Sequence, residues 1–167
     1  MQAGGNAADA AVATAAALNV TEPTSTGLGG DCFALFYDAK SKEIHALNGS
    51  GHSPRALTMD LIQKEGFQEG IPLFHPYTIT VPGAAAGWSD MVAAHGNLSL
   101  EKVLSPAIRL AEEGFPVAPV TAYFWERGAK IQLSSAPNGE ELTIEGRAPL
   151  PGETFKNPGL ARTMKKL

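Results

Sequence analysis

The sequence predicts a mixed α/β fold in which helices and strands form layers (α+β layered). An alanine-rich segment with helix-capping residues comes first, two apolar runs of strand length follow, and several further segments carry helix start and stop signals. Because 44% of the 167 residues are hydrophobic and only 18% are charged, the composition is that of a folded chain of one-domain length. Two strands are few for so many helices, so the pattern implies more sheet than these residues supply.

The first helix is predicted over residues 7–18. Asn6 is a favourable N-cap residue, and the carboxylate of Asp9 in the first turn complements the helix dipole. The segment between them and Leu18 consists almost entirely of alanine. We therefore expect a narrow helix that can approach its neighbours closely.

Two strands follow, at residues 32–39 and 43–47, and the polar residues between them predict a hairpin connection. The next segment, 48–54, contains two glycines and is predicted to be a loop. Further helices are expected where capping residues, prolines or glycines bound apolar runs: 58–65, 83–95, 99–104, 106–113, 119–130 and a last one that begins after Asn157. Residues 134–153 read as a turn-rich linker.

Several classes of function are excluded by composition. The formal net charge is −4 and the cationic residues are scattered, so nucleic acid is not an expected partner. A single cysteine excludes an internal disulfide and a cysteine-based zinc cluster. The four histidines show no metal-ligand spacing.

The glycine-rich segment 27–30 does not support nucleotide binding, because a dinucleotide loop follows a strand and opens a helix. Here a helix precedes the glycines and a strand follows them. Cys32 begins an apolar strand without a basic neighbour, which favours a packed thiol over a nucleophile.

Residue-level chemistry yields one candidate position. His52 follows the glycines of the 48–54 loop, where a polar side chain can face a cleft. No serine stands in a G-x-S-x-G elbow, so a hydrolase nucleophile has no local support. The residues alone therefore predict no complete catalytic constellation.

Five segments, in order along the chain, resemble the γ-glutamyltransferase family (γ-glutamyltranspeptidases, glutathione hydrolases). They correspond to its Q-x-G-G-N-A-x-D-A-A-V-A opening, its S-x-G-[IL]-G-G strand entry, its V-P-G helix start, its L-S-P-A-I-R-L-A-E-E-G-F-P-V stretch and its N-P-x-L-A-R-T segment. In this sequence they are residues 2–13, 25–30, 80–83, 104–117 and 157–163.

The resemblance implies an N-terminal nucleophile hydrolase with an αββα sandwich. Family members are precursors that cut themselves into a large and a small subunit, and the new N-terminal threonine of the small subunit is the nucleophile. They act on γ-glutamyl amides and need no metal or organic cofactor. The expected partners are therefore a γ-glutamyl or acyl amide substrate and the small subunit of the same precursor.

Two departures from the family pattern shape the expectation for this chain. No threonine matches the nucleophile motif, so we expect residues 1–167 to be an incomplete N-terminal portion of the large subunit, without a catalytic residue of their own. Transpeptidases carry D-x-R-E-x-A-P after the second strand, whereas this chain has Ser50 in place of the arginine. Ser50 and His52 are thus the candidate substrate-binding residues, and the N-G-S-G form resembles the acylase-like branch of the family.

Two alternatives to a γ-glutamyl amide hydrolase remain open. One is a cephalosporin or glutaryl acylase of the same family, and the other is a non-catalytic truncated product. Family precursors are often exported or membrane-anchored, but these residues contain no signal that defines a location.

Overall fold

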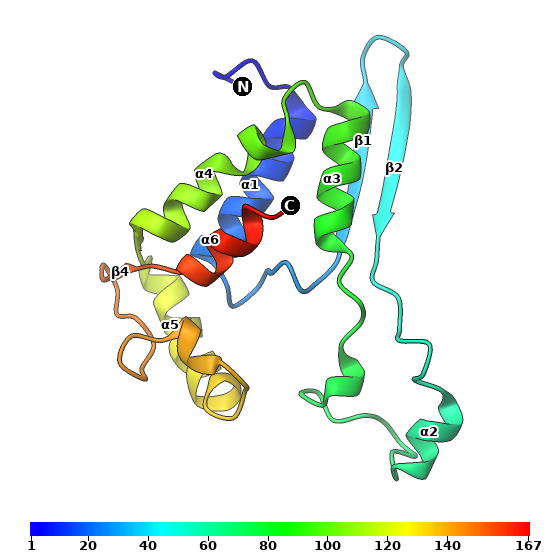
Figure 1. Ribbon diagram of the computed structural model, residues 1–167, viewed down its shortest axis with the longest axis vertical. Coiled ribbons are helices and arrows are strands. Elements are labelled where there is room, and N and C mark those ends of the chain that lie inside the picture. The colour runs from blue at the N-terminus through cyan, green and yellow to red at the C-terminus, as the bar shows by residue number, and fades with distance from the viewer. The chain divides into compact units, whose positions relative to one another are not determined.

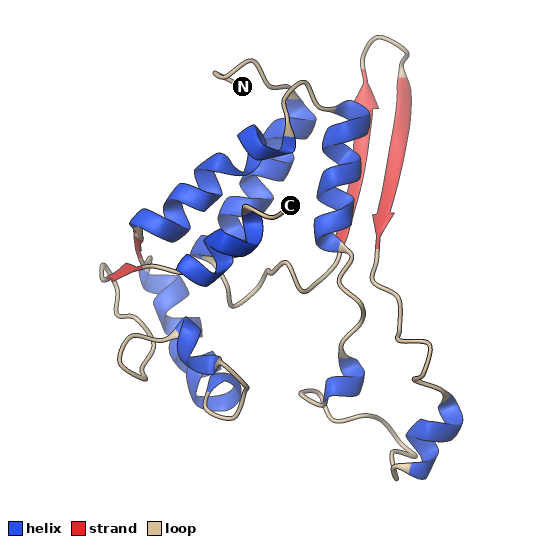
Figure 2. Ribbon diagram, viewed as in Figure 1, coloured by secondary structure: helices blue, strands red, loops and turns tan.

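The computed structural model describes residues 1–167 and contains two compact units (Figure 1). The first unit comprises Met1–Gly27 together with Trp88–Leu167, and the second comprises Leu28–Gly87. Helix α3 (Ala84–His95) begins in the second unit and ends in the first. The expected mixture of helices and strands is confirmed, and the longer strands lie in a single hairpin of the second unit (Figure 2).

The first unit is mainly helical. It contains helices α1, α4, α5 and α6. It also contains two very short strands, β3 and β4, which pair antiparallel and which the sequence did not predict. The bounds of these elements are α1 Ala7–Thr21, α4 Leu100–Glu113, β3 Phe115–Pro116, α5 Pro119–Gly128, β4 Thr154–Phe155 and α6 Pro158–Met164. None of the helices has the length and apolar character needed to cross a membrane.

Helix α1 begins where the sequence predicts and extends three residues beyond Leu18. The Asn6 side chain accepts hydrogen bonds from the N–H groups of Ala8 and Asp9, while the Asp9 carboxylate accepts the Asn6 N–H at 2.8 Å. This reciprocal capping box satisfies backbone donors that a helix start leaves unpaired. The start of α1 is therefore encoded by two side chains.

Helix α4 corrects one prediction, because it runs unbroken through Pro106 where the sequence predicted one helix ending at residue 104 and another starting at 106. A proline inside a helix removes one N–H and leaves the carbonyl four residues earlier without its donor. Here that carbonyl belongs to Lys102, and the hydroxyl of Ser105 donates to it at 2.9 Å. The serine thus replaces the missing backbone hydrogen bond.

The core of the first unit lies between α4 and its neighbours, since α4 packs against both α1 and α6. Its largest fully buried side chains include Leu104, Trp125 and Met164, each 1% exposed. The Trp125 indole N–H donates to the carbonyl of Leu142 at 2.9 Å, and its ring meets Phe155 edge-on. This unit therefore has an apolar core of its own.

The second unit is built on the hairpin of β1 (Cys32–Asp38) and β2 (Glu43–Gly49), which pair antiparallel with Cys32 opposite Gly49. The predicted strands and their connection are confirmed, but β2 also includes Asn48 and Gly49, which the sequence assigned to the following loop, because they pair with Phe33 and Cys32. One face of the hairpin carries Phe33, Leu35 and Ile44, which are 67%, 78% and 70% exposed. An apolar sheet face that is this open is unusual in a folded protein.

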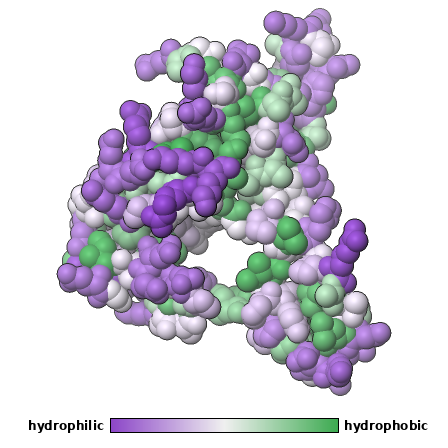
Figure 3. All heavy atoms as spheres, viewed as in Figure 1, coloured by the Kyte–Doolittle hydropathy of each residue, from purple (hydrophilic) through white to green (hydrophobic).

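The rest of the second unit follows β2 as α2 (Met59–Lys64) and a 3₁₀ turn at Pro76–Thr78. Thr58 caps α2 by accepting the N–H of Leu61 at 3.2 Å, as predicted. The rings of Phe67, His75 and Tyr77 form a small edge-to-face cluster. Figure 3 shows apolar residues at the surface over the segment that contains α2.

Candidate functional site

The segment predicted as the 48–54 loop shares its first two residues with the end of β2, and its first turn is set by its own sequence. The Ser50 N–H donates to the side-chain oxygen of Asn48 at 3.0 Å, which is an Asx turn. The side chains of Ser50 and His52 are both exposed. The candidate residues therefore stand on a backbone of defined shape and present their polar atoms to solvent.

A carboxylate from the start of β1 holds the middle of this loop. Asp31 Oδ1 accepts the Gly51 N–H at 2.7 Å, across 20 residues of sequence. Hydrogen bonds from a backbone N–H to a charged acceptor are among the stronger ones in proteins. The sequence does not predict this contact, because nothing in the order of residues pairs Asp31 with Gly51.

The end of the loop is tied to the segment that precedes α3. The Val81 N–H donates to the carbonyl of His52 at 2.8 Å, and the two residues form an isolated antiparallel bridge. A side chain on Gly51 would overlap the Val81 carbonyl and the Thr80 hydroxyl. Glycine at position 51 is required because two backbones meet here at close range.

Two of the motif segments, 25–30 and 80–83, converge on this loop. The carbonyl of Gly30 accepts the N–H groups of Gly83 and Ala84 at 3.1 and 3.0 Å, and a Cβ on Gly83 would overlap the carbonyl of Gly49. The G-G, N-G-S-G and V-P-G segments therefore form one backbone junction. At Gly49, Gly51 and Gly83 an added Cβ would overlap a neighbouring backbone carbonyl, so these positions require the absence of a side chain.

Cys32 lies beside this junction as the first residue of β1 and is half-buried. Burial raises the pKa of its thiol above the ordinary value, so the thiol stays protonated at neutral pH. Because Cys32 is only half-buried, its interpretation as a packing residue stays a prediction. The chain also has no group of three His, Cys, Asp or Glu side chains that could coordinate a metal ion.

Asp9, the acidic residue of the opening motif, lies in the first unit and has a structural role. Its carboxylate is 2% exposed and accepts the N–H groups of Asn6, Asn97 and Leu98. Burial acts to raise the pKa of Asp9, but the hydrogen bonds from these N–H groups outweigh it and lower the pKa. This carboxylate joins the start of α1 to the turn that follows α3.

The five motif segments of the sequence lie in the helices of the first unit and in the glycine junction of the second. The sequence matches the gamma-glutamyltranspeptidase family model across residues 1–167, and the chain belongs to that family. The resemblance carried by the five motif segments is thus confirmed.

Particular relatives include both hydrolase-like and acylase proteins. The chain is 39% identical over 162 residues to the glutathione hydrolase-like YwrD proenzyme of Bacillus subtilis, covering 96% of this chain and 30% of that protein. It is similar to the crystal structure of cephalosporin acylase from Bacillus halodurans, with a TM-score of 0.92, 40% identity, 99% of this chain covered and 32% of that one.

The structure of Helicobacter pylori gamma-glutamyltranspeptidase matches with a TM-score of 0.88 and 27% identity, covering 99% of this chain and 48% of that chain. The residues described here span about a third of the length of the Bacillus proteins they match. These matches extend over both units of the chain.

Proposed function

We propose that residues 1–167 are part of the large subunit of an enzyme that cleaves γ-glutamyl amides. The nucleophile would be an N-terminal threonine in a part of the protein outside these residues. Family membership over the whole chain supports the reaction class, and the glutathione hydrolase-like relative supports the substrate class. The observation that carries the proposal is the match to the gamma-glutamyltranspeptidase family model over residues 1–167.

In this mechanism the threonine hydroxyl attacks the amide carbonyl and its own amine takes the proton. The amine of the amide leaves, and water or an acceptor amine then releases the acyl group. Oriented hydrogen-bond donors stabilise the tetrahedral oxyanion, so no cofactor is required. This chain contributes to binding of the acyl group, while the small subunit of the same precursor supplies the nucleophile.

We assign that binding role to Ser50 and His52. Both side chains are exposed on a loop whose backbone is held by Asp31, Asn48 and Val81. A serine offers one neutral hydroxyl, whereas the arginine of the transpeptidase pattern offers a charged, bidentate contact to a carboxylate. His52 is the one ionisable side chain between positions 48 and 54.

Ser50 also favours a second candidate function, hydrolysis of a glutaryl or related acyl amide as in cephalosporin acylases. Without arginine, the loop loses the group that selects an amino acid's α-carboxylate. The 40% identity to the Bacillus halodurans acylase points in the same direction. The two candidates share the reaction and differ in the acyl group that the loop accepts.

The experiment is an assay of the full-length protein, expressed with its complete reading frame, on a γ-glutamyl anilide and on a glutaryl amide. Turnover of the anilide supports the first candidate, and turnover of the glutaryl amide alone supports the second. A precursor that matures yet cleaves neither substrate would contradict both and favour a non-catalytic product.

Variants of the loop make this assay sharper. Ser50→Arg should raise kcat/KM for the γ-glutamyl anilide relative to the glutaryl amide, because it restores a carboxylate contact. Ser53→Arg adds the same charge three residues further along the loop and serves as the matched control. Equal effects of the two variants on kcat/KM would show that Ser50 does not contact the substrate.

We further propose that the β1–β2 hairpin belongs to an αββα sandwich whose second sheet comes from the remainder of the protein. The apolar side chains of Phe33, Leu35 and Ile44 on one open face support this, since sheets in a sandwich bury such faces against each other. Leu35→Lys should then abolish soluble full-length protein, whereas Lys42→Ala in the connection should not. Normal yield of Leu35→Lys would contradict a buried face.

A further inference from the structure

A groove of about 580 Å³ lies in the first unit between α5 and the residues before β4. Its floor includes Ala122 and Ala148, which are 5% and 8% exposed, and its walls include Tyr123 and Leu150. The sequence predicted a helix on one side of this groove and a turn-rich linker on the other, but no cavity between them. The volume falls within the range of about 300–1,000 Å³ that is typical of small-molecule sites.

The backbone around the groove departs from regular helix on one side. The residues after α5 form a π-helical turn, Ala129–Leu133, and its first two residues line the groove. Turns of this kind widen a helix and occur frequently at functional sites. The π-helical turn therefore forms part of the groove's lining.

The opposite side of the groove is a loop with an unusual backbone. Glu145 has a φ of 51° and Gly146 has a φ of 80°, and a left-handed conformation is uncommon for glutamate. Gly146 begins the stretch of the loop that lines the groove, and this stretch ends at Pro151. Such conformations persist only where surrounding contacts enforce them. Two backbone hydrogen bonds between Ile144 and Arg147 close the turn that contains Glu145 and Gly146.

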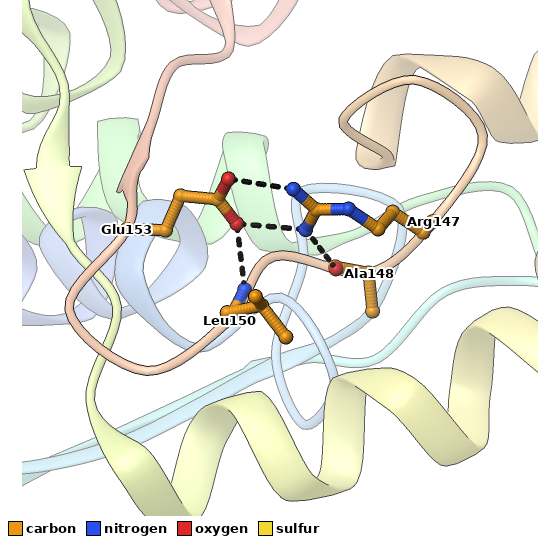
Figure 4. A network of polar contacts seen from close by, with 4 residues as sticks. All are labelled: Arg147, Ala148, Leu150 and Glu153. Carbon is orange, nitrogen blue, oxygen red and sulfur yellow. Dashed lines mark hydrogen bonds and ion pairs between the residues drawn. The ribbon is translucent and has the colours of Figure 1, made fainter.

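The stretch after this turn is held by Glu153 (Figure 4). Its carboxylate accepts two hydrogen bonds from the Arg147 guanidinium and one from the Leu150 N–H, each at 2.8 Å. The same guanidinium donates to the carbonyl of Ala148 at 3.1 Å. The loop is thus held in shape by its own side chains, and the groove is already formed without a ligand.

The charges along the groove are paired within the protein. Lys130 contacts Glu126 at 2.7 Å across one helical turn, and Arg147 is engaged by Glu153. No charged group that lines the groove lacks an opposite charge. A charged ligand would therefore have to displace one of these pairs, whereas an uncharged one would not.

We propose that this groove is a binding site for an uncharged, mostly apolar small molecule that packs against Tyr123 and Leu150. Both side chains are more than half exposed, at 57% and 59%, so a ligand would remove their apolar surface from water. The proposal concerns the first unit alone and does not depend on the function assigned to the 48–54 loop.

The test uses the full-length protein and the neutral fluorophore N-phenylnaphthylamine, whose emission rises in an apolar site. Saturable binding is expected, and Tyr123→Ala or Leu150→Ser should weaken it by about tenfold through loss of buried apolar surface. Ile131→Ala is the matched control, because Ile131 is 59% exposed, lies in the π-helical turn beside the groove and does not line it. It should leave the affinity unchanged.

Three results would overturn the proposal. The first is absence of saturable binding, as expected if another part of the protein covers the groove. The second is equal weakening by Ile131→Ala and Tyr123→Ala. The third is tighter binding of the anionic analogue anilinonaphthalenesulfonate than of the neutral probe, which would show that the ligand is not an uncharged one.

Discussion

The two units of this chain hold their shape by different means. In the first unit, large side chains such as Leu104 and Trp125 are 1% exposed and pack into a shared core. In the second, Leu35 and Ile44 are 78% and 70% exposed, and the hairpin and glycine junction are joined by backbone hydrogen bonds. Burial of one large apolar side chain contributes roughly 1.5–3 kcal/mol, so the first unit draws on a source of stability that the second uses little.

This contrast teaches that the loop with the candidate binding residues lies in the unit with the smaller core. A site held by backbone contacts depends on a few close approaches, and a single added methyl group can disturb it. A site held by a packed core tolerates surface changes and fails when a core residue is removed. The following variants test the contrast, from the largest expected effect to the smallest.

The largest effect is expected from Trp125→Ala in the core of the first unit. The variant leaves a cavity and removes the donor to the Leu142 carbonyl, and it should lower the free energy of unfolding by about 3–5 kcal/mol. Urea denaturation measures the change. Phe124→Ala, at the exposed neighbouring position, should cost about 1 kcal/mol or less. Similar losses in both variants would mean that the first unit has no dominant core.

Asp9→Ala should destabilise the first unit by about 2–4 kcal/mol, because the N–H groups of Asn6, Asn97 and Leu98 lose a charged acceptor. Asp60→Ala, in the first turn of α2, changes an exposed acid and should cost about 0.5 kcal/mol. Chemical denaturation compares the two variants. Equal losses would show that the Asp9 hydrogen bonds contribute little.

The same carboxylate predicts a pH dependence. The pKa of Asp9 is lower in the folded protein than its ordinary value of 3.8, so its stabilising contribution is fully present above that value. The contribution is lost as pH falls through the lower, folded pKa. The stability difference between the unmodified protein and Asp9→Asn should therefore shrink in acid, and a constant difference would contradict this account.

A smaller, local effect is expected from Gly51→Ala in the second unit. The added methyl group would overlap the Val81 carbonyl, and relief of this overlap should cost about 1–3 kcal/mol at the His52–Val81 bridge. Faster hydrogen exchange of the Val81 N–H is the readout. Gly70→Ala is the control, since a Cβ there would meet no atom within 4 Å. An unchanged rate of hydrogen exchange at the Val81 N–H in Gly51→Ala would show that the junction accommodates the methyl group without loss of the His52–Val81 bridge.

The smallest effect concerns the Arg147–Glu153 pair, which is exposed and contributes little to global stability. Hydrogen bonds from Arg147 and Leu150 lower the pKa of Glu153 to about 2, and Arg147→Gln should return it towards 4.5. The contribution of the pair is therefore present above pH 4.5 and is lost as the pH falls to about 2. A carboxyl-detected NMR titration measures this, and Lys165→Gln, which breaks a separate ion pair, should leave it unchanged.

Local signals in the sequence were sufficient for most of the elements. Asn6, Thr58 and Gly114 act at helix ends as cap or stop residues do in isolation, because capping depends on a few consecutive residues. The same reasoning predicted a break at Pro106. It was wrong there because the Ser105 hydroxyl supplies the hydrogen bond that the proline lacks.

The candidate site was predictable only in part. Ser50 and His52 could be placed in a loop from its glycines and from the family resemblance, and their role in binding stays a proposal. The contacts of Asp31 with Gly51 and of Val81 with His52 could not be predicted, since 20 and 29 residues separate the partners. No local pattern encodes which distant backbone a glycine will meet.

By itself the sequence determined the family, the positions of most helices and strands and the loop that carries Ser50 and His52, because motifs, caps and turns act over short stretches. The tertiary structure alone decided which glycines form the junction, which apolar side chains are buried and which stay open, and that residues 146–151 of the predicted linker form one wall of a groove. The physical reason is that burial and close backbone approach are properties of pairs of segments distant in sequence.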